Sequence, residues 1–204
     1  MKKDTRQRIL DAAQNLFNQY GYNGVSLHDI AEEIGISKGN LTYHFAKKEE
    51  IIESLLAGEI DTFPKEPPAT LRELDNLFDD MQKTVQSHSY FFLHHAQLAQ
   101  ISQEVLKKQK DRYGNVSAIL KESFDILCSK GLFRREIFHG EYQHLIDMVH
   151  MSAIYWAPFE KIRSSSDVYI DFRYHVWGLL YNLLTEKGRR VLRDSEIIYH
   201  NANE

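Results

Sequence analysis

The sequence has one cysteine, Cys128, and only four prolines among its 204 residues. A single cysteine excludes a disulfide within the chain and is typical of proteins that stay in a reducing compartment. No uninterrupted apolar run approaches the ~18 residues that a membrane-spanning helix needs. The first residues are basic but no apolar signal segment follows them, so we expect a cytoplasmic protein that does not enter a membrane.

The chain also lacks the excess of positive charge that marks many nucleic-acid-binding domains. Its formal net charge is −4, and residues 1–50 carry seven basic and seven acidic groups. Any nucleic-acid-binding surface must therefore depend on where individual cations lie and not on their total.

Alternating strand patterns are missing as well, and apolar residues instead recur at helical spacing. Three of the prolines lie together at 64–68 and mark the clearest break in the chain. The polar tail beyond Asp194 is expected to be frayed. The pattern predicts an all-α protein with a first helix that ends at Gly21, followed by helices at 27–34, 38–44, 47–63, 70–87, 89–98, 102–129, 141–162 and 168–187.

Two short predicted helices near the N-terminus begin in the same way. Ser26 is placed as the N-cap of the first, with Asp29 three residues later, and Ser37 is placed as the N-cap of the second. In both cases one apolar residue precedes the cap and another lies in the following turn. The three-residue turn "GIS" separates the two helices, which is the pattern of a helix-turn-helix at about residues 25–44.

The second helix of this pair, in the segment "GISKGNLTYHF", contains few residues that must be buried. Leu41 and Phe45 are four residues apart and point inward together. Glycine inside a helix costs about 0.5–1 kcal/mol relative to alanine, so it indicates a close approach of the backbone to another molecule. The remaining polar side chains can bond to phosphates or base edges. This outward set is Lys38, Gly39, Asn40, Thr42, Tyr43 and His44.

Residues 8 to about 55 closely resemble the DNA-binding region of the TetR/AcrR family of bacterial transcriptional regulators. The matching stretches are "ILDAAQNLFNQYGY", "VSLHDIAEEIGIS" and "KGNLTYHFAKKEE", without gaps. The resemblance implies a three-helix DNA-binding domain at 1–50 and an effector-binding and dimerisation domain at 51–204, joined by the 47–63 helix. It implies that Tyr43, His44 and Lys48 mainly contact phosphates. The full set of residues that the resemblance implies for DNA contact is Ser26, Ser37, Lys38, Gly39, Asn40, Thr42, Tyr43, His44 and Lys48.

The predicted helices at 141–162 and 168–187 carry apolar residues on more than one face. A helix that is apolar on two sides must be covered on two sides. One side would pack in the domain core, and the other would pack against the same helices of a second copy in a four-helix interface. The alternative is that both apolar faces point into one thick core.

By the example of that family, residues 71–130 should carry a pocket for a small-molecule effector. The segment "SHSYFFLHHAQLAQ" is dense in aromatic residues and histidines, and such a mixture suits a binding pocket. The alternative is that these aromatic residues are plain core, and nothing in the composition identifies the effector. The candidate ligand-binding residues are Tyr90, Phe91, His94, His95, Tyr155 and Trp156.

No catalytic or metal site stands out. We find no paired carboxylates, nucleophile with a base, or phosphate loop, and His139, His144 and His150 lack the spacing of four that a shared metal on one helix face needs. We therefore expect no catalytic residues, no metal and no cofactor, and interpret Cys128 as a small buried apolar residue.

The favoured hypothesis is a homodimeric repressor, which a small-molecule effector releases from a palindromic double-stranded DNA operator. Two alternatives remain open. The chain could be an α-helical enzyme whose helix pair is incidental, or an adaptor that uses the helix pair to bind another protein.

Overall fold

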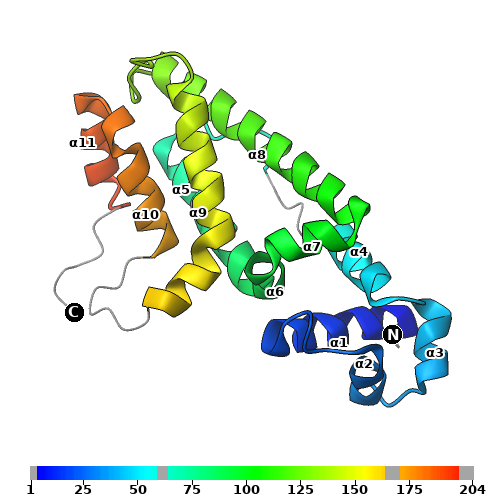
Figure 1. Ribbon diagram of the computed structural model, residues 1–204. Coiled ribbons are helices and arrows are strands. Elements are labelled where there is room, and N and C mark those ends of the chain that lie inside the picture. Colours follow the sequence, from blue (N-terminus) through cyan, green and yellow to red (C-terminus); the bar gives the residue numbers. More distant parts are fainter. Residues whose placement is uncertain (1–3, 59–63, 164–170, 198–204) are drawn as a thin grey trace, which may run out of the picture. The chain divides into compact units, whose positions relative to one another are not determined.

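A computed structural model of the protein describes residues 4–58, 64–163 and 171–197 (Figure 1). These ranges contain helices and no β-strand, apart from one isolated antiparallel bridge between Phe133 and Leu184. The predicted all-α fold is confirmed. Within the described ranges, every helix is too short or too polar to serve as a membrane span. The same ranges hold no cluster of His, Cys, Asp or Glu that could bind a metal.

The chain divides into two compact units. The first comprises residues 1–62 and 87–112, and the second comprises 63–86 and 113–204. The predicted boundary between residues 50 and 51 falls inside a helix of the first unit.

The first unit is built from short helices around an apolar core. Its helices are α1 (Thr5–Tyr20), α2 (Leu27–Glu33), α3 (Lys38–His44), α4 (Lys48–Gly58), α6 (Ser89–Leu93), α7 (His95–Ile101) and the first part of α8 (Gln103–Ser129). Helix α1 packs against α2, α4 and α6. Residues 59–63 of the helix predicted at 47–63 lie outside the described residues. Fully buried core residues from four of the helices are Ile9, Phe17, Ile30, Leu41 and Ile51.

One side chain, Asn18 on α1, fastens α6 to the N-terminal helices. Its Nδ2 donates to the backbone oxygen of Ser87 at 3.1 Å, and its Oδ1 accepts from Ser89 Oγ and from the Tyr90 N–H, both at 3.1 Å. The rings of Phe17 and Tyr90 lie 5.9 Å apart. Residues 87–112 therefore pack with the N-terminal helices, although α5 separates them in the chain.

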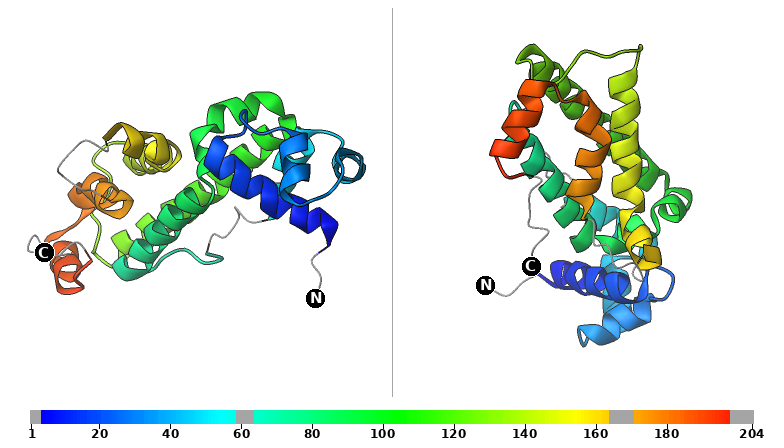
Figure 2. Two further views of the ribbon diagram at one scale, coloured as in Figure 1. Left: turned by 90° about the horizontal axis from the view of Figure 1, so that it is seen from below. Right: turned by 90° about the vertical axis from the view of Figure 1, so that its left-hand side faces the viewer.

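The second unit contains α5 (Leu71–Ser87), the rest of α8, α9 (Glu141–Arg163), α10 (Phe172–Leu180), the 3-10 turn η1 (Tyr181–Leu183) and α11 (Glu186–Asp194). Helices α9 and α10 lie side by side (Figure 2). A buried polar contact joins α10 to α5, because Trp177 Nε1 donates to Asp75 Oδ1 at 3.0 Å. The Phe78 ring packs edge-on against the same Trp177 ring, 5.7 Å away.

The helix predicted at 89–98 is in fact two helices that meet at His94. The His94 N–H bonds to Tyr90 O and closes α6, and the His94 carbonyl accepts from the Leu98 N–H and opens α7. The physical reason is a tertiary contact that apolar periodicity does not contain. A Cβ on Gly21 would lie 2.8 Å from His94 Nε2, so the imidazole at the break occupies space that only a glycine at position 21 leaves open.

The helix predicted at 168–187 is also wrong in extent, and its residues 168–170 lie outside the described residues. Helix α10 ends at Leu180, and Leu184 is extended because it pairs with Phe133. Thr185 then caps α11, its Oγ1 accepting from the Gly188 N–H at 3.0 Å. Helix α11, which was not predicted, ends at Asp194, and residues 198–204 of the polar tail lie outside the described residues.

One smaller expectation stays open and one changes. Val176 and Trp177, one from each predicted apolar face of α10, are buried within one copy, whereas Tyr174 and Leu179 are half-buried and Tyr181, just after α10, is 44% exposed. Packing of α10 against a second copy stays a prediction. Cys128 is half-buried, not buried. It follows Leu127, which takes the inward position on α8, so Cys128 is turned about 100° away from that direction.

Candidate nucleic-acid interface

The start of α2 has the geometry that its sequence predicts. Asp29 donates its backbone N–H to Ser26 Oγ at 3.2 Å, and Asp29 Oδ2 accepts from the Ser26 N–H at 2.8 Å. This reciprocal pair is a capping box, with aspartate in place of the commoner glutamate. The bonds from Ser26 hold the pKa of Asp29 below its ordinary value. Val25 and Ile30 are buried beside it, as a hydrophobic staple requires.

A tight turn ends α2 and sets the direction of α3. The Gly35 N–H bonds to Glu32 O at 3.1 Å, and the Ile36 N–H bonds to Ala31 O at 3.0 Å. This is a Schellman motif, which needs a residue with positive φ, and Gly35 has φ +68°. Ser37 then caps α3 by accepting from the Asn40 N–H at 3.1 Å. Helix α3 therefore starts from a defined turn.

The predicted DNA-contacting residues of α3 lie on its outer side. Leu41 and Phe45 are buried, whereas Lys38, Gly39 and Asn40 are exposed. Tyr43 is 87% exposed, which is unusual for an aromatic side chain. Thr42 and His44 are half-buried. The outer side carries donors, acceptors and a cation, and no carboxylate lies between residues 38 and 48.

Nothing within the described chain explains the glycine at position 39. A Cβ there would meet only Ser37 Oγ, at an ordinary distance of 3.9 Å. The residue is helical and does not have positive φ. Its cost in helix stability is therefore not offset by a contact inside the protein, which favours a role toward another molecule.

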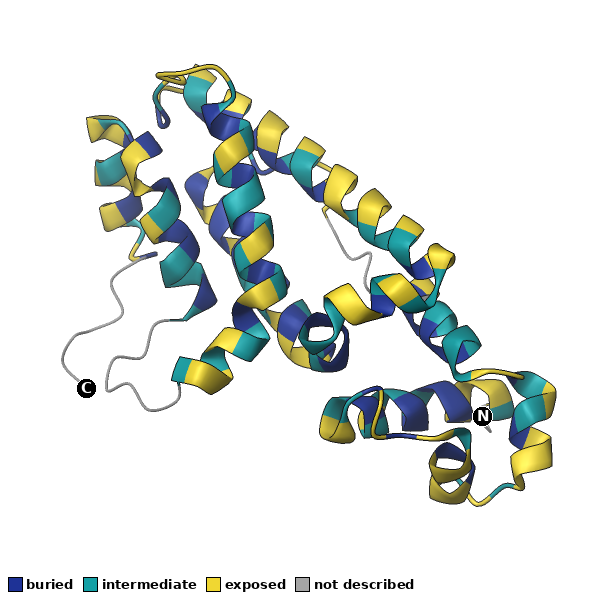
Figure 3. Ribbon diagram, viewed as in Figure 1, coloured by how far each residue is buried: buried dark blue, intermediate teal, exposed yellow. Residues whose placement is uncertain are grey.

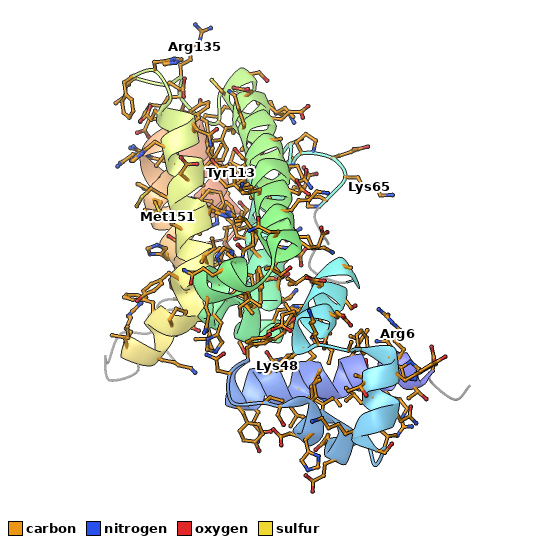
Figure 4. The ribbon with its side chains drawn as sticks, turned by 45° about the vertical axis from the view of Figure 1, so that its right-hand side comes forward. Arg6, Lys48, Lys65, Tyr113, Arg135 and Met151 are labelled. Carbon is orange, nitrogen blue, oxygen red and sulfur yellow. The ribbon has the colours of Figure 1, made fainter. Side chains whose placement is uncertain are left out.

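Lys48, the first residue of α4, points into the protein (Figure 4). Its Nζ donates to the backbone oxygens of Tyr22 at 2.6 Å and Val25 at 2.7 Å, and lies 4.1 Å from the centroid of the Tyr22 ring. Burial lowers the pKa of Lys48 and raises the pKa of Tyr22 to about 12. Lys48 thus links α4 to the loop before α2, which leaves one ammonium proton for a phosphate.

Two arginines that the sequence shows only as part of a basic N-terminal arm hold this assembly together. The Arg8 Nη2 donates to Ile34 O at 2.8 Å, so α1 supports the end of α2. The Arg6 guanidinium lies 4.8 Å from the Phe45 ring centroid and donates to Ser54 Oγ at 2.9 Å. The sequence around Arg6 and Arg8 gave no sign of these partners, because both contacts are made to residues far away in the chain. Lys2 and Lys3 lie outside the described residues.

The predicted ligand-binding residues occur in both units. In the first unit Tyr90 and Phe91 are buried, and His94 and His95 are half-buried. A cavity of about 410 Å³ in that unit is lined by residues of α1 and α4, none of which belongs to the predicted set. In the second unit Trp156 is buried against Phe172 and His175, whereas Tyr155 is 58% exposed. The ligand-binding set stays a prediction.

Sequence comparison assigns both parts of the chain to one class of proteins. Residues 9–55 match the family described as "Bacterial regulatory proteins, tetR family", and residues 56–192 match the family described as "Bacterial transcriptional repressor". The transcriptional regulator AcrR of Shigella flexneri is 34% identical over a region that covers 35% of this chain. That region spans only 39% of the length of AcrR.

Solved structures share the fold over nearly the whole chain. A TetR-family transcriptional regulator from Marinobacter aquaeolei VT8 superimposes with a TM-score of 0.79 at 24% identity, covering 95% of this chain and 98% of the other. A transcriptional regulator from Saccharomonospora viridis, solved in complex with choline, gives a TM-score of 0.71 at 18% identity, covering 89% and 97%. At these identities the likeness describes the fold.

Proposed function

The chain belongs to the TetR family of bacterial regulatory proteins, and on this basis we propose that it is a sequence-specific, DNA-binding transcriptional regulator. The observation that carries the proposal is the outer side of α3. A capped helix with a tightly defined start presents Lys38, Asn40 and Tyr43 to solvent without a carboxylate among them. Such side chains suit base edges and phosphates in a major groove about 12 Å wide.

The proposed contacts differ in what they contribute. Tyr43, His44 and Lys48 bind phosphates and position the helix, with Ser26 and Ser37 assisting from the helix starts. In this proposal Lys38, Asn40 and Thr42 contact base edges, so they carry sequence preference. Gly39 lets the backbone approach the duplex closely.

We infer that the regulator acts as a homodimer, because one reading helix contacts only half of a palindromic operator. Dimers place their reading helices about 34–36 Å apart to enter successive major grooves. An exposed apolar stripe on α9 supports this proposal (Figure 3). Its members recur at three- and four-residue spacing and are Met151, Tyr155, Phe159 and Ile162. Tyr181, on the turn after α10, is a further exposed aromatic residue of the same unit.

The response to an effector is proposed to pass through the contacts that fasten α6 to α1. Asn18 bonds to Ser87, Ser89 and Tyr90, so a displaced α6 would have to break these bonds or carry α1 with it. A coupling of about 1–3 kcal/mol between effector and operator changes operator affinity about 5- to 150-fold, which is enough for a switch. We propose that the effector releases the operator, which makes the protein a repressor.

The first experiment selects bound fragments from random double-stranded DNA with the purified full-length protein. We expect a palindromic product. Fluorescence anisotropy then measures affinity for this duplex and for a single half-site. Tyr43→Ala should weaken binding at least tenfold, whereas Tyr20→Ala is the matched control, because Tyr20 is also exposed, at 59%, but lies on α1. The proposal fails if no duplex is enriched, or if both variants bind like the parent.

A further inference from the structure

A cavity at one end of the second unit has the chemistry of a binding site. It is open to solvent and has a volume of about 430 Å³, within the usual range of about 300–1,000 Å³ for small-molecule sites. The start of α5, the end of α8 and α11 supply its walls. The lining residues are Thr70, Leu71, Arg72, Lys130, Leu132, Lys187, Val191 and Ser195.

The interior surface of the cavity is apolar and is held in place. Leu71 and Leu132 are buried at its base, with 1% and 8% exposure, and Val191, which is 39% exposed on α11, is the aliphatic wall that a ligand chain can cover. The wall positions are constrained by backbone contacts. A Cβ on Gly188 would come within 2.2 Å of Leu132 O, and Thr185 Oγ1 donates to Gly131 O at 2.7 Å.

Three cations surround these apolar residues, and no lining residue is acidic. Lys130 Nζ donates to Ala69 O at 2.6 Å, Lys187 Nζ donates to Lys130 O at 2.8 Å, and Arg72 donates to Ser195 O. Among the described residues, none of the three forms an ion pair with a carboxylate. Each ammonium has two further protons and the guanidinium has four, so all three retain donors for a ligand.

In a chain with net charge −4, three cations thus surround an apolar cavity. Arg72 also interacts electrostatically with the Asp75 carboxylate, so Lys130 and Lys187 are the two cations that have no acidic partner among the described residues. A simple anion would use the cations but leave the apolar surface wet. A neutral hydrocarbon would cover that surface but leave the cations without a counter-charge. A molecule with an anionic head and a short aliphatic chain would both supply the counter-charge for the cations and cover the apolar surface.

We propose that this cavity binds a small amphiphilic anion, with its carboxylate or phosphate head between Lys130, Lys187 and Arg72 and its aliphatic chain on Leu71, Leu132 and Val191. Because such a ligand contacts α5, α8 and α11 together, it stabilises the second unit by mass action. The site goes beyond the proposed function, since none of its residues belongs to the DNA interface or to the six candidate ligand-binding residues, although Leu71, Arg72 and Lys130 fall within the region 71–130 that was expected to carry an effector pocket.

The test uses the full-length protein with methyl-labelled leucine and valine. Octanoate is titrated while the methyl signals of Leu71, Leu132 and Val191 are followed by NMR. Leu120, which is fully buried on α8 outside the cavity, reports any global change. Octyl phosphate serves as a second head group, octanol has a chain without a charge, and acetate has a charge without a chain. We expect saturable shifts with octanoate or octyl phosphate, at least tenfold weaker binding of octanol, and no shifts with acetate.

Variants identify the cations. Lys130→Gln and Lys187→Gln should each weaken octanoate about tenfold, and Lys187→Arg should restore most of the affinity. Lys121→Gln is the matched control, because Lys121, like Lys130, is an exposed lysine, but it lies on α8 away from the cavity and faces Asp125 at 3.8 Å. Thermal unfolding of each variant without ligand checks that it is folded.

The inference is overturned if octanoate and octyl phosphate leave the three methyl signals unchanged at millimolar concentration. It is also overturned if octanol binds as well as octanoate, or if Lys121→Gln weakens binding as much as Lys130→Gln. None of these measurements involves DNA. A protein that binds octanoate here but ignores every duplex would refute the proposed function and leave this site standing.

Discussion

The ammonium of Lys48 lies 2.6 Å from the backbone oxygen of Tyr22 and 4.1 Å from the centroid of the same tyrosine ring. One residue of α4 thus bonds to the loop that begins α2, and it does so from a half-buried position. The contact means that a lysine expected to bind phosphate also holds the helix-turn-helix to the rest of its unit. Measurements of stability and of DNA affinity on one substitution can distinguish these two roles.

Replacing Lys48 by methionine keeps the aliphatic stem and removes the charge. Bonds to charged groups contribute about 1.5–3 kcal/mol each, and partial exposure reduces that figure, so we expect the free energy of unfolding to fall by about 2 kcal/mol. If the remaining proton contacts a phosphate, affinity for every sequence falls and the salt slope decreases by about 0.9. Urea unfolding and anisotropy at several salt concentrations measure both. Lys47→Met is the control, because Lys47 is exposed and its loss should leave stability unchanged. An unchanged free energy of unfolding in Lys48→Met would contradict the holding role.

Gly39→Ala should move stability and DNA affinity in opposite directions. The new Cβ meets only Ser37 Oγ at 3.9 Å, so the first unit should become more stable by about 0.5–1 kcal/mol. The same methyl group would separate the backbone from the duplex and weaken operator binding at least fivefold. Gly114→Ala on α8 is the control, since it also has free space and should stabilise without affecting DNA. Unchanged operator affinity in Gly39→Ala would show that the backbone of α3 does not approach DNA closely.

Thr42 should influence sequence preference more than total affinity. Its Oγ1 donates to Gly39 O at 3.1 Å, which leaves the methyl group and a lone pair for a base. Thr42→Ala should therefore change the ranking of operator variants, by about 1–3 kcal/mol at one base pair. Thr42→Val keeps a methyl group, and Thr42→Ser keeps the hydroxyl, so the pair tells which group is read. Selection from random DNA with each variant gives the answer, and identical consensus sequences from all of them would rule out a base contact.

Local signals in the sequence were sufficient to predict how α2 and α3 begin. The caps of α2 and α3 depend on Ser26, Asp29 and Ser37, and each bonds within three residues of itself. The all-α fold and the outward position of Tyr43 also follow from periodicity. These features could be predicted because their causes lie within one helical turn.

The features that sequence reasoning missed have causes far away in the chain. Helix α10 stops where it does because Leu184 pairs with Phe133, and the break at His94 depends on Gly21. Arg6 and Arg8 looked like free cations, but their partners are on other helices. Helical spacing continues through both breaks, so no pattern of apolar residues could have revealed them.

The capping box predicts a dependence of stability on pH. Bonds from Ser26 lower the folded-state pKa of Asp29 below 3.8, so the ionised carboxylate is favoured in the folded protein. Its contribution is present above the unfolded pKa and is lost as the pH falls through the folded pKa. The stability difference between the parent and Asp29→Asn should therefore shrink as the pH falls below about 4. Carbon-detected NMR of the Asp29 carboxyl, with urea unfolding at each pH, measures both quantities. A titration midpoint at or above 3.8 would contradict the capping geometry.

The exposed stripe on α9 predicts that a single charge abolishes dimerisation. Met151, Tyr155 and Ile162 are 54%, 58% and 67% exposed in one copy (Figure 4 labels Met151), and burying them between two copies is the expected source of affinity. Tyr155→Asp places a carboxylate without a partner in that apolar surface, and burying an unpaired charge costs far more than one tyrosine contributes.

Sedimentation velocity at micromolar concentration should therefore give a dimer for the parent and a monomer for Tyr155→Asp. The variant should also lose its preference for the palindrome over a half-site, because each monomer then binds DNA on its own. Tyr20→Asp is matched in exposure, at 59%, but lies on α1, so it should remain dimeric. A parent protein that sediments as a monomer, or a Tyr155→Asp variant that stays dimeric, would exclude α9 as the interface.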